Sequence, residues 1–255
     1  MNAANYIRRL IMNKMTYREM LGAQDPARIA AHILAVLMSV FLLVRFVTVL
    51  VTGEDPDGRM LSYLAVAVLA LLPYLFELIS RRRLTTFVLL LYTVYLFVAG
   101  FWGGCMCVYE RVPGTDKVVH TLFGYVACII GLFVVCGMND YSGLSPVFVA
   151  ITCFAVSLAL AACWELVEFA GDAFLNGTYQ GNYVETVAGT FVQPKNDTMT
   201  DILVHFIGSA VFELHYILHR LTRKNLGMGY MINDFSSYRG VPAPAPGRPS
   251  GINAN

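Results

Sequence analysis

The chain is a series of long apolar runs separated by shorter polar segments. Six of the runs approach the ~20 residues that a helix needs to cross the hydrocarbon core of a bilayer. The pattern therefore predicts an all-α fold, a polytopic integral membrane bundle of six transmembrane helices. The predicted spans are residues 29–51, 60–79, 84–104, 118–137, 147–171 and 201–221.

Composition supports a membrane protein and argues against a nucleic-acid-binding one. Of the 255 residues, 57% are hydrophobic and 14% are charged, whereas a soluble domain carries ~25% charged residues. The mean hydropathy is +0.60. Because the formal net charge is only +1 and no long basic run is present, we expect no nucleic-acid partner. The expected partner is the membrane lipid bilayer.

The spans divide the chain into three regions. Residues 1–28 are a predicted cytoplasmic N-terminal arm, in which 5–21 carry a weak amphipathic pattern typical of an interfacial helix. Residues 29–224 are the membrane domain, and its half 116–221 carries the candidate site. Residues 225–255 are a predicted cytoplasmic tail, which we expect to be largely disordered because its end is rich in Pro and Gly.

The positions of Lys and Arg predict the orientation of the spans, because basic residues are retained on the cytoplasmic side. They are concentrated before the first span, between the second and third, and after the sixth. We therefore expect a multi-pass protein of the cell membrane with both termini in the cytoplasm. On that side, Glu77 and Arg81 have the four-residue spacing of an ion pair. The opposite side holds Arg59, Arg111, Lys117 and Lys195.

Ionisable residues cluster at one end of the last three predicted spans. A charged side chain at the bilayer centre costs ~2.5–3.5 kcal/mol by insertion scales, so such residues usually serve a function. The predicted orientation places the cluster on the extracytoplasmic side. Its members are Asp116, Lys117 and His120 on the fourth span, Glu165, Glu168 and Asp172 on the fifth, and Asp197, Asp201 and His205 on the sixth.

Helical spacing predicts that these side chains converge on a metal site. Residues three or four positions apart share a helix face, and each of the three groups has this spacing. Carboxylates and imidazoles bind divalent cations, and a further carboxylate can act as a general base toward bound water. The imidazoles favour zinc or manganese over calcium. The expected metal ligands are His120, Glu168, Asp201 and His205. The expected catalytic residues are Glu165 and Asp116. Further site candidates are Asp172, Asp197, Lys117 and Gln180.

Structural roles also account for several of these residues. Asp116 and Asp197 lie at helix starts, where a carboxylate caps free backbone N–H groups. His120 and His205 fit interior imidazoles held by hydrogen bonds. Glu213, deeper in the sixth span, fits either a proton path or an interhelical hydrogen bond. The sequence does not decide between these roles.

Glu165 and Glu168 need a cation more strongly than the aspartates do. They lie inside an apolar run near the C-terminal end of a predicted helix, where the macrodipole disfavours anions. The cation could be a metal ion, a protonated histidine, Lys117 or Arg45. A purely structural salt bridge is the alternative.

The segment 172–196 is long for a connection between two spans. It joins two of the helices that carry candidate site residues, and long connections in such places often cover a site. We therefore expect a lid here, with Gln180 near its start.

These residues resemble the motifs of the YjdF-like family of uncharacterised bacterial inner-membrane proteins. In that family an asparagine tends to stand where this chain has His205, and the YQG and DTM elements lie close together, whereas here residues 182–196 intervene. The resemblance implies a multi-pass inner-membrane protein and supplies no established reaction. The shared elements are DKVVH at 116–120, WELVEFAGD at 164–172, YQG at 179–181 and DTMTD at 197–201, followed by Gly208.

A looser similarity is to VanZ-like membrane proteins. They share a DKxxH opening of one span and a later D-x-x-x-N-x-x-G element, which corresponds here to Asp201, His205 and Gly208. VanZ-like proteins are associated with glycopeptide resistance, so this similarity implies a role at the cell envelope.

Three functions fit the predicted site. The first is a metal-assisted hydrolase or transferase acting on a lipid or lipid-linked envelope substrate. The second is a transporter of protons or divalent cations, in which ionisable residues should continue to the cytoplasmic end, whereas here they become sparse. The third is a non-catalytic envelope or scaffolding protein. We favour the first because the candidate residues cluster at one membrane face.

Overall fold

The described part of the chain in the computed structural model consists of helices and one short hairpin. The hairpin pairs β1 (Val184–Glu185) with β2 (Phe191–Val192) in antiparallel register. The predicted helix at 5–21 and the end of the tail lie outside the described residues, as does most of the predicted lid. The structure describes residues 25–55, 58–80, 83–138, 141–175, 179–180, 184–185, 191–192 and 197–237.

The helices confirm the prediction of an all-α membrane protein with six spans. Six helices in the described part of the chain are long and apolar enough to cross a bilayer. Three short helices accompany them: α6 (Val108–Arg111), η2 (Tyr141–Gly143) and α10 (Met228–Ser237). The long helices are α3 (Pro26–Thr52), α4 (Met60–Ser80), α5 (Thr86–Leu96) continued by the π-helix η1 (Phe97–Cys105), α7 (Thr115–Met138), α8 (Pro146–Leu175) and α9 (Asp197–Thr222).

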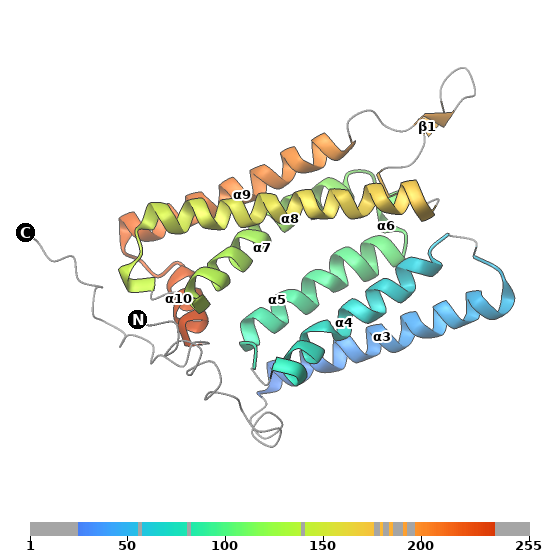
Figure 1. The fold of residues 1–255 in the computed structure, drawn as a ribbon, viewed down its shortest axis with the longest axis horizontal. Helices are drawn as coiled ribbons and strands as arrows, with labels where there is room; N and C mark the ends of the chain where they lie inside the picture. The colour runs from blue at the N-terminus through green and yellow to red at the C-terminus, as the bar shows by residue number, and fades with distance from the viewer. Residues whose placement is uncertain are drawn as a thin grey trace, which may run out of the picture. The chain divides into compact units, whose positions relative to one another are not determined.

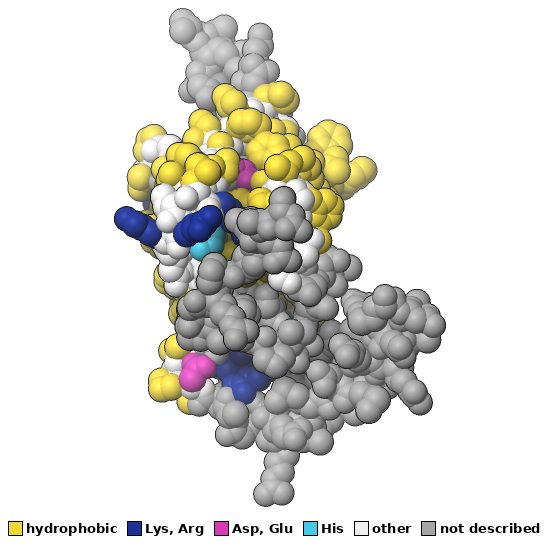
Figure 2. Space-filling model, turned by 90° about the vertical axis from the view of Figure 1, so that its left-hand side faces the viewer, with side chains coloured by type: hydrophobic (Ala, Val, Ile, Leu, Met, Phe, Trp, Pro, Cys, Tyr) yellow, Lys and Arg dark blue, Asp and Glu magenta, His cyan; other side chains and the backbone are white. Residues whose placement is uncertain are grey.

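Large apolar side chains remain exposed along the spans. Leu37 and Val51 on α3 are 62% and 79% exposed, and Ile151 on α8 is 64% exposed. On the face shown in Figure 2, most of the described surface side chains are hydrophobic. Apolar surface in water costs ~25 cal/mol per Å². These faces are therefore suited to contact with lipid.

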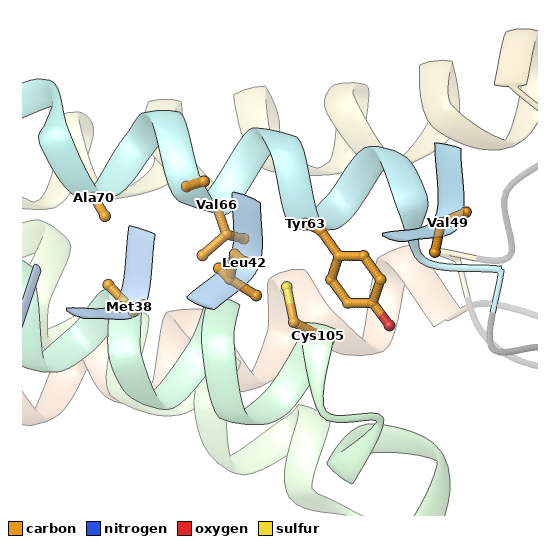
Figure 3. Close-up of a cluster of buried hydrophobic side chains, with 8 residues drawn as sticks. Met38, Leu42, Val49, Tyr63, Val66, Ala70 and Cys105 are labelled. Atoms are coloured by element: carbon orange, nitrogen blue, oxygen red, sulfur yellow. The ribbon is translucent and has the colours of Figure 1, made fainter. Parts of the chain in front are cut away.

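The chain forms two compact units, residues 1–108 and 109–255. In unit 1, α3 packs against α4 and α5 (Figure 1). The buried cluster in Figure 3 includes Leu42, Tyr63 and Cys105, and the Cys105 thiol packs there as a small apolar group. Ser39 Oγ donates a 3.0 Å hydrogen bond to the Ala67 carbonyl, which further ties α3 to α4.

A buried ion pair joins the helices of unit 1 at the end where α3 begins. Arg28 is 2% exposed and pairs with Glu77, which also accepts a 2.6 Å hydrogen bond from the Leu84 backbone N–H. Arg28 Nη1 donates to the Leu84 carbonyl at 2.9 Å. The sequence predicted Arg81 as the partner of Glu77. Arg81 lies outside the described residues. In the structure Glu77 pairs with Arg28, which is farther away in the sequence.

In unit 2, α7 packs against both α8 and α9 (Figure 1). Glycines allow this close approach. A Cβ atom at Gly208 would overlap with the Thr121 carbonyl oxygen, and one at Gly124 would overlap with the His205 carbonyl oxygen. On the α8 side, a Cβ at Gly131 would lie 2.8 Å from Cys153 Cα. Small residues therefore set the helix separations that position the candidate site.

Helix α10 is a feature that the sequence analysis did not predict. It lies in the region expected to be a largely disordered tail and packs against α7 and α9. Met228, Met231, Ile232 and Phe235 are buried and follow the i, i+3, i+4, i+7 spacing of an apolar helix face. The helix is short, so this stripe is easily overlooked beside the long spans.

Candidate metal centre

Helices α7 and α9 bring two carboxylates and one imidazole together near their first turns. One ligand atom each from Asp116, His120 and Asp201 lies within 4.8 Å of the other two. His120 Nε2 is 3.4 Å from Asp116 Oδ1 and 4.0 Å from Asp201 Oδ1. His120 is 6% exposed and Asp201 is 1% exposed. These three residues form the candidate metal centre.

Lys117 lies among the carboxylates of this centre. Its ammonium donates to Asp116 Oδ2 at 3.0 Å and to both Asp197 Oδ1 and Asp201 Oδ1 at 2.6 Å. It thereby links the first turn of α7 to the first two turns of α9. Lys117 was expected from the sequence as a further site candidate and as one of several possible cations for the glutamates. Spacing along one helix shows which residues share a face of that helix, but it does not show their distance from another helix. The distance of Lys117, which directly follows Asp116, from α9 could therefore not be predicted.

Glu165 on α8 approaches the opposite side of the same imidazole. Its Oε1 lies 3.9 Å from His120 Nδ1, whereas the two aspartates face Nε2. Glu165 is 6% exposed, and its Oε2 is buried with no hydrogen-bond partner among the described residues. A buried carboxylate is costly without a nearby donor or cation, so Glu165 adds to the demand for positive charge beside this imidazole.

The charges in this region are unbalanced. Four carboxylates, from Asp116, Asp197, Asp201 and Glu165, surround Lys117 and His120. If all four are ionised and His120 is neutral, the formal charge is −3. Such an excess of negative charge in a partly buried site attracts a cation or protons. The cluster is therefore suited to a divalent metal ion.

Two of the predicted metal ligands lie outside this group. The Glu168 carboxylate accepts a 2.7 Å hydrogen bond from Trp164 Nε1. His205 Nε2 lies 2.8 Å from Ser157 Oγ, in the interior of the bundle. His205 is one turn along α9 from Asp201, and a helical turn is ~5.4 Å long. Sharing a helix face with Asp201 therefore does not bring His205 into the group formed by Asp116, His120 and Asp201.

Asp172 and Gln180 are brought together at the end of α8. Asp172 accepts hydrogen bonds from the backbone N–H groups of Tyr179 at 2.6 Å and Gln180 at 3.0 Å. Gln180 Nε2 donates to Thr198 Oγ1 at 2.9 Å. These contacts tie the described start of the predicted lid to α8 and α9. The lid prediction otherwise falls on residues that the structure does not describe.

Ser157 and Ser209 are buried polar residues that the sequence analysis did not single out. Both are 0% exposed, and their hydroxyl oxygens are 2.8 Å apart. Serine in an apolar run gives a weak signal because it often hydrogen-bonds the backbone of its own helix. The available signal was the four-residue spacing of His205 and Ser209.

Comparison with known proteins places the chain in a family. No curated protein and no solved structure matches the chain significantly. A family model described as a predicted membrane protein, DUF2238, matches residues 33–222, from within the first candidate span to the end of the last. This is the family to which the YjdF-like motifs point. The chain therefore belongs to the DUF2238 family of predicted membrane proteins.

Proposed function

We propose that this protein is a membrane-embedded, metal-dependent hydrolase or transferase acting on a lipid or lipid-linked envelope substrate. One observation carries the proposal: the ligand atoms of Asp116, His120 and Asp201 lie within 4.8 Å of one another. Three protein ligands would leave positions for water and for a substrate oxygen. A metal ion in that arrangement polarises the substrate and activates the water.

The neighbouring side chains support this assignment. Lys117 holds Asp116 by Oδ2, so Oδ1 stays on the side of His120 Nε2. Glu165 faces His120 Nδ1, which is the position of a carboxylate that orients a metal-binding histidine. Glu165, expected from the sequence as a catalytic base, is thus assigned a positioning role. The mixed nitrogen and oxygen ligands favour zinc or manganese.

The location of the centre supports a substrate at the membrane surface. Asp116 and Lys117 are near the start of a span, and the side chain of each is 33% exposed. The distribution of Lys and Arg supports cytoplasmic termini, which would place this end of unit 2 outside the cytoplasm. The similarity of the DKxxH element to VanZ-like proteins supports a role at the cell envelope.

Metal binding is tested on protein purified in detergent without chelators. We expect about one zinc or manganese ion per chain by elemental analysis, and a rise in thermal unfolding temperature when metal is returned after chelation. Asp201→Asn and His120→Gln should lose both effects, whereas His219→Gln, which changes a partly exposed histidine near the other end of α9, should keep them. No bound metal together with no metal-dependent stabilisation in the wild type would contradict the proposal.

The reaction class is tested separately with extracted envelope lipids. Metal-loaded protein should release phosphate, headgroup or acyl chain from the extract, as measured by mass spectrometry. Asp201→Asn and chelated wild type should release none. A protein that binds metal but changes no lipid in the extract would retain the metal centre and lose the enzyme assignment.

A further inference from the structure

Protonatable and hydroxyl side chains form a stripe along one face of α9. Asp201, His205, Ser209 and Glu213 follow one another at intervals of four residues. Residues at this spacing are neighbours on the same side of a helix. The stripe leads from the candidate metal centre into the middle of a membrane span, where ionisable groups usually serve a function.

Hydrogen bonds connect the middle of this stripe to the neighbouring helices. His205 Nε2 lies 2.8 Å from Ser157 Oγ on α8, which in turn lies 2.8 Å from Ser209 Oγ on α9. Ser157 Oγ also lies 3.0 Å from the Gly124 carbonyl on α7. The three side chains are 0% exposed. They form a continuous chain of groups that can each accept and donate a proton.

Two atoms on either side of this chain lack partners. His205 Nδ1 and Glu213 Oε1 are both buried without a hydrogen-bond partner among the described residues. A purely structural interhelical network would satisfy its buried polar atoms, because each unpartnered one costs roughly 1–3 kcal/mol. Each end of the chain thus offers a buried atom that can bind a proton.

A further hydroxyl pair continues toward the opposite end of unit 2. Tyr216, one turn beyond Glu213, has its hydroxyl 3.1 Å from that of Tyr141. Tyr141 belongs to η2, between α7 and α8, and lies outside the candidate spans. Polar side chains on α9 therefore occur from its second turn to the level of the connection at the other end of unit 2.

We propose that unit 2 contains a proton conduit in which His205, Ser157, Ser209 and Glu213 relay protons through the membrane. His205 accepts a proton at Nδ1 and releases one from Nε2 to Ser157 Oγ. The Ser157 hydroxyl passes its own proton to Ser209 Oγ, and the Ser209 hydroxyl passes its proton on toward the Glu213 carboxylate. Each intermediate accepts one proton and gives up one, so no charge remains on the serines and no electron moves.

The conduit is independent of the metal proposal. His205 and Glu213 are not among the three proposed metal ligands. His120 on α7 acts electrostatically on His205, and Glu213 acts electrostatically on Cys128 on α7 and on Cys153 on α8. A protein that binds no metal could therefore still conduct protons, and a protein that conducts no protons could still bind metal.

The test uses the full chain in phosphatidylethanolamine and phosphatidylglycerol vesicles that contain a pH-sensitive dye. A potassium gradient with valinomycin supplies the membrane potential, and the rate of internal pH change gives the proton flux. Wild type should conduct several-fold faster than protein-free vesicles, and chelator should not change the rate. His205→Gln and Glu213→Gln should reduce the flux to that of protein-free vesicles.

Two controls separate conduction from folding. His219→Gln alters a partly exposed histidine on the same helix, outside the proposed relay, and should leave the flux unchanged. Ser209→Ala removes a single hydroxyl and should reduce the flux while keeping the wild-type elution profile and helical circular dichroism. Wild-type flux equal to that of empty vesicles would overturn the proposal. Unchanged flux in both His205→Gln and Glu213→Gln would also overturn it.

Discussion

The Lys117 ammonium lies 2.6 Å from Asp201 Oδ1, although 84 positions separate the two residues. The Lys117 side chain is 33% exposed, whereas that of Asp201 is 1% exposed. The buried carboxylate on α9 is therefore neutralised by a cation that reaches it from α7. This pair links the two helices at the candidate metal centre.

Replacing Lys117 with Gln should destabilise the metal-free protein. The change leaves Asp197 and Asp201 without their shared cation, and we expect a loss of about 1–3 kcal/mol, less than for a fully buried pair. Added zinc should restore more stability to Lys117→Gln than to the wild type, because the variant cluster is more negative. Thermal unfolding with and without zinc measures both effects. Lys224→Gln, an exposed lysine, is the control, and equal stability of the two variants would contradict the assigned role of Lys117.

Gly208→Ala should separate α7 from α9. A Cβ there would overlap with the Thr121 carbonyl, and backbone cannot move aside as a flexible side chain can. Overpacking of this kind typically costs about 1–3 kcal/mol. Gly143→Ala has no atom within 4 Å of the added carbon and should be neutral. Thermal unfolding of both variants tests this, and a Gly208→Ala protein as stable as Gly143→Ala would show that the close approach is unimportant.

The proposed orientation places both termini in the cytoplasm. Alkaline phosphatase, which is active only outside the cytoplasm, should be active when fused after Asp57 and inactive when fused after Leu144. The physical reason is the retention of Lys and Arg on the cytoplasmic side. Active phosphatase after Leu144 would reverse the orientation and move the candidate metal centre to the cytoplasmic face.

The spans were predictable because a bilayer imposes one requirement, a long apolar helix, that any sequence must meet locally. The same local reasoning placed Asp116, His120 and Asp201 on converging helix faces. It could not show which of Asp201 and His205 faces His120, because both lie on the same face of α9. The answer depends on the position of α7 along the axis of α9. That position depends on Gly124 and Gly208, which allow close contact between two helices that are distant in the sequence.

The pairing of Glu77 with Arg28 was not predicted, for a related reason. The sequence offered Arg81 at a favourable spacing, whereas the structure uses Arg28 from the preceding span. Long-range pairing of this kind depends on how α3 packs against α4. A local spacing rule cannot anticipate it.

Glu77→Gln should destabilise unit 1 by about 3–5 kcal/mol, because breaking a buried ion pair leaves an uncompensated charge. Arg28 is 2% exposed and would lose its anion while remaining buried. Arg28→Met combined with Glu77→Gln should recover part of the loss, since no unpaired charge remains. Glu54→Gln, an exposed glutamate, serves as the control in denaturation experiments. Additive losses in the double variant would argue against a direct pair.

Asp25 should make the start of α3 sensitive to acid. Its carboxylate accepts a 2.6 Å hydrogen bond from Thr86 Oγ1 and a 2.7 Å bond from the Arg28 backbone N–H. These bonds, that from Thr86 foremost, hold the pKa of Asp25 below its ordinary value of 3.8. A lowered pKa in the folded state means that the stabilisation is complete above 3.8 and disappears as the pH falls through the folded-state pKa.

Thr86→Val removes the stronger of these donors while keeping the shape of the side chain. The variant should be less stable than the wild type at neutral pH. The difference should narrow as the pH falls through the lowered folded-state pKa of Asp25, because below that pH both proteins carry a protonated Asp25. Thermal unfolding over a pH series measures the difference. Thr48→Val removes an exposed hydroxyl whose hydrogen bond to the Val44 carbonyl lies within α3, and its effect should not vary with pH. A stability difference for Thr86→Val that stays constant across the series would show that the ionised carboxylate contributes nothing to this cap.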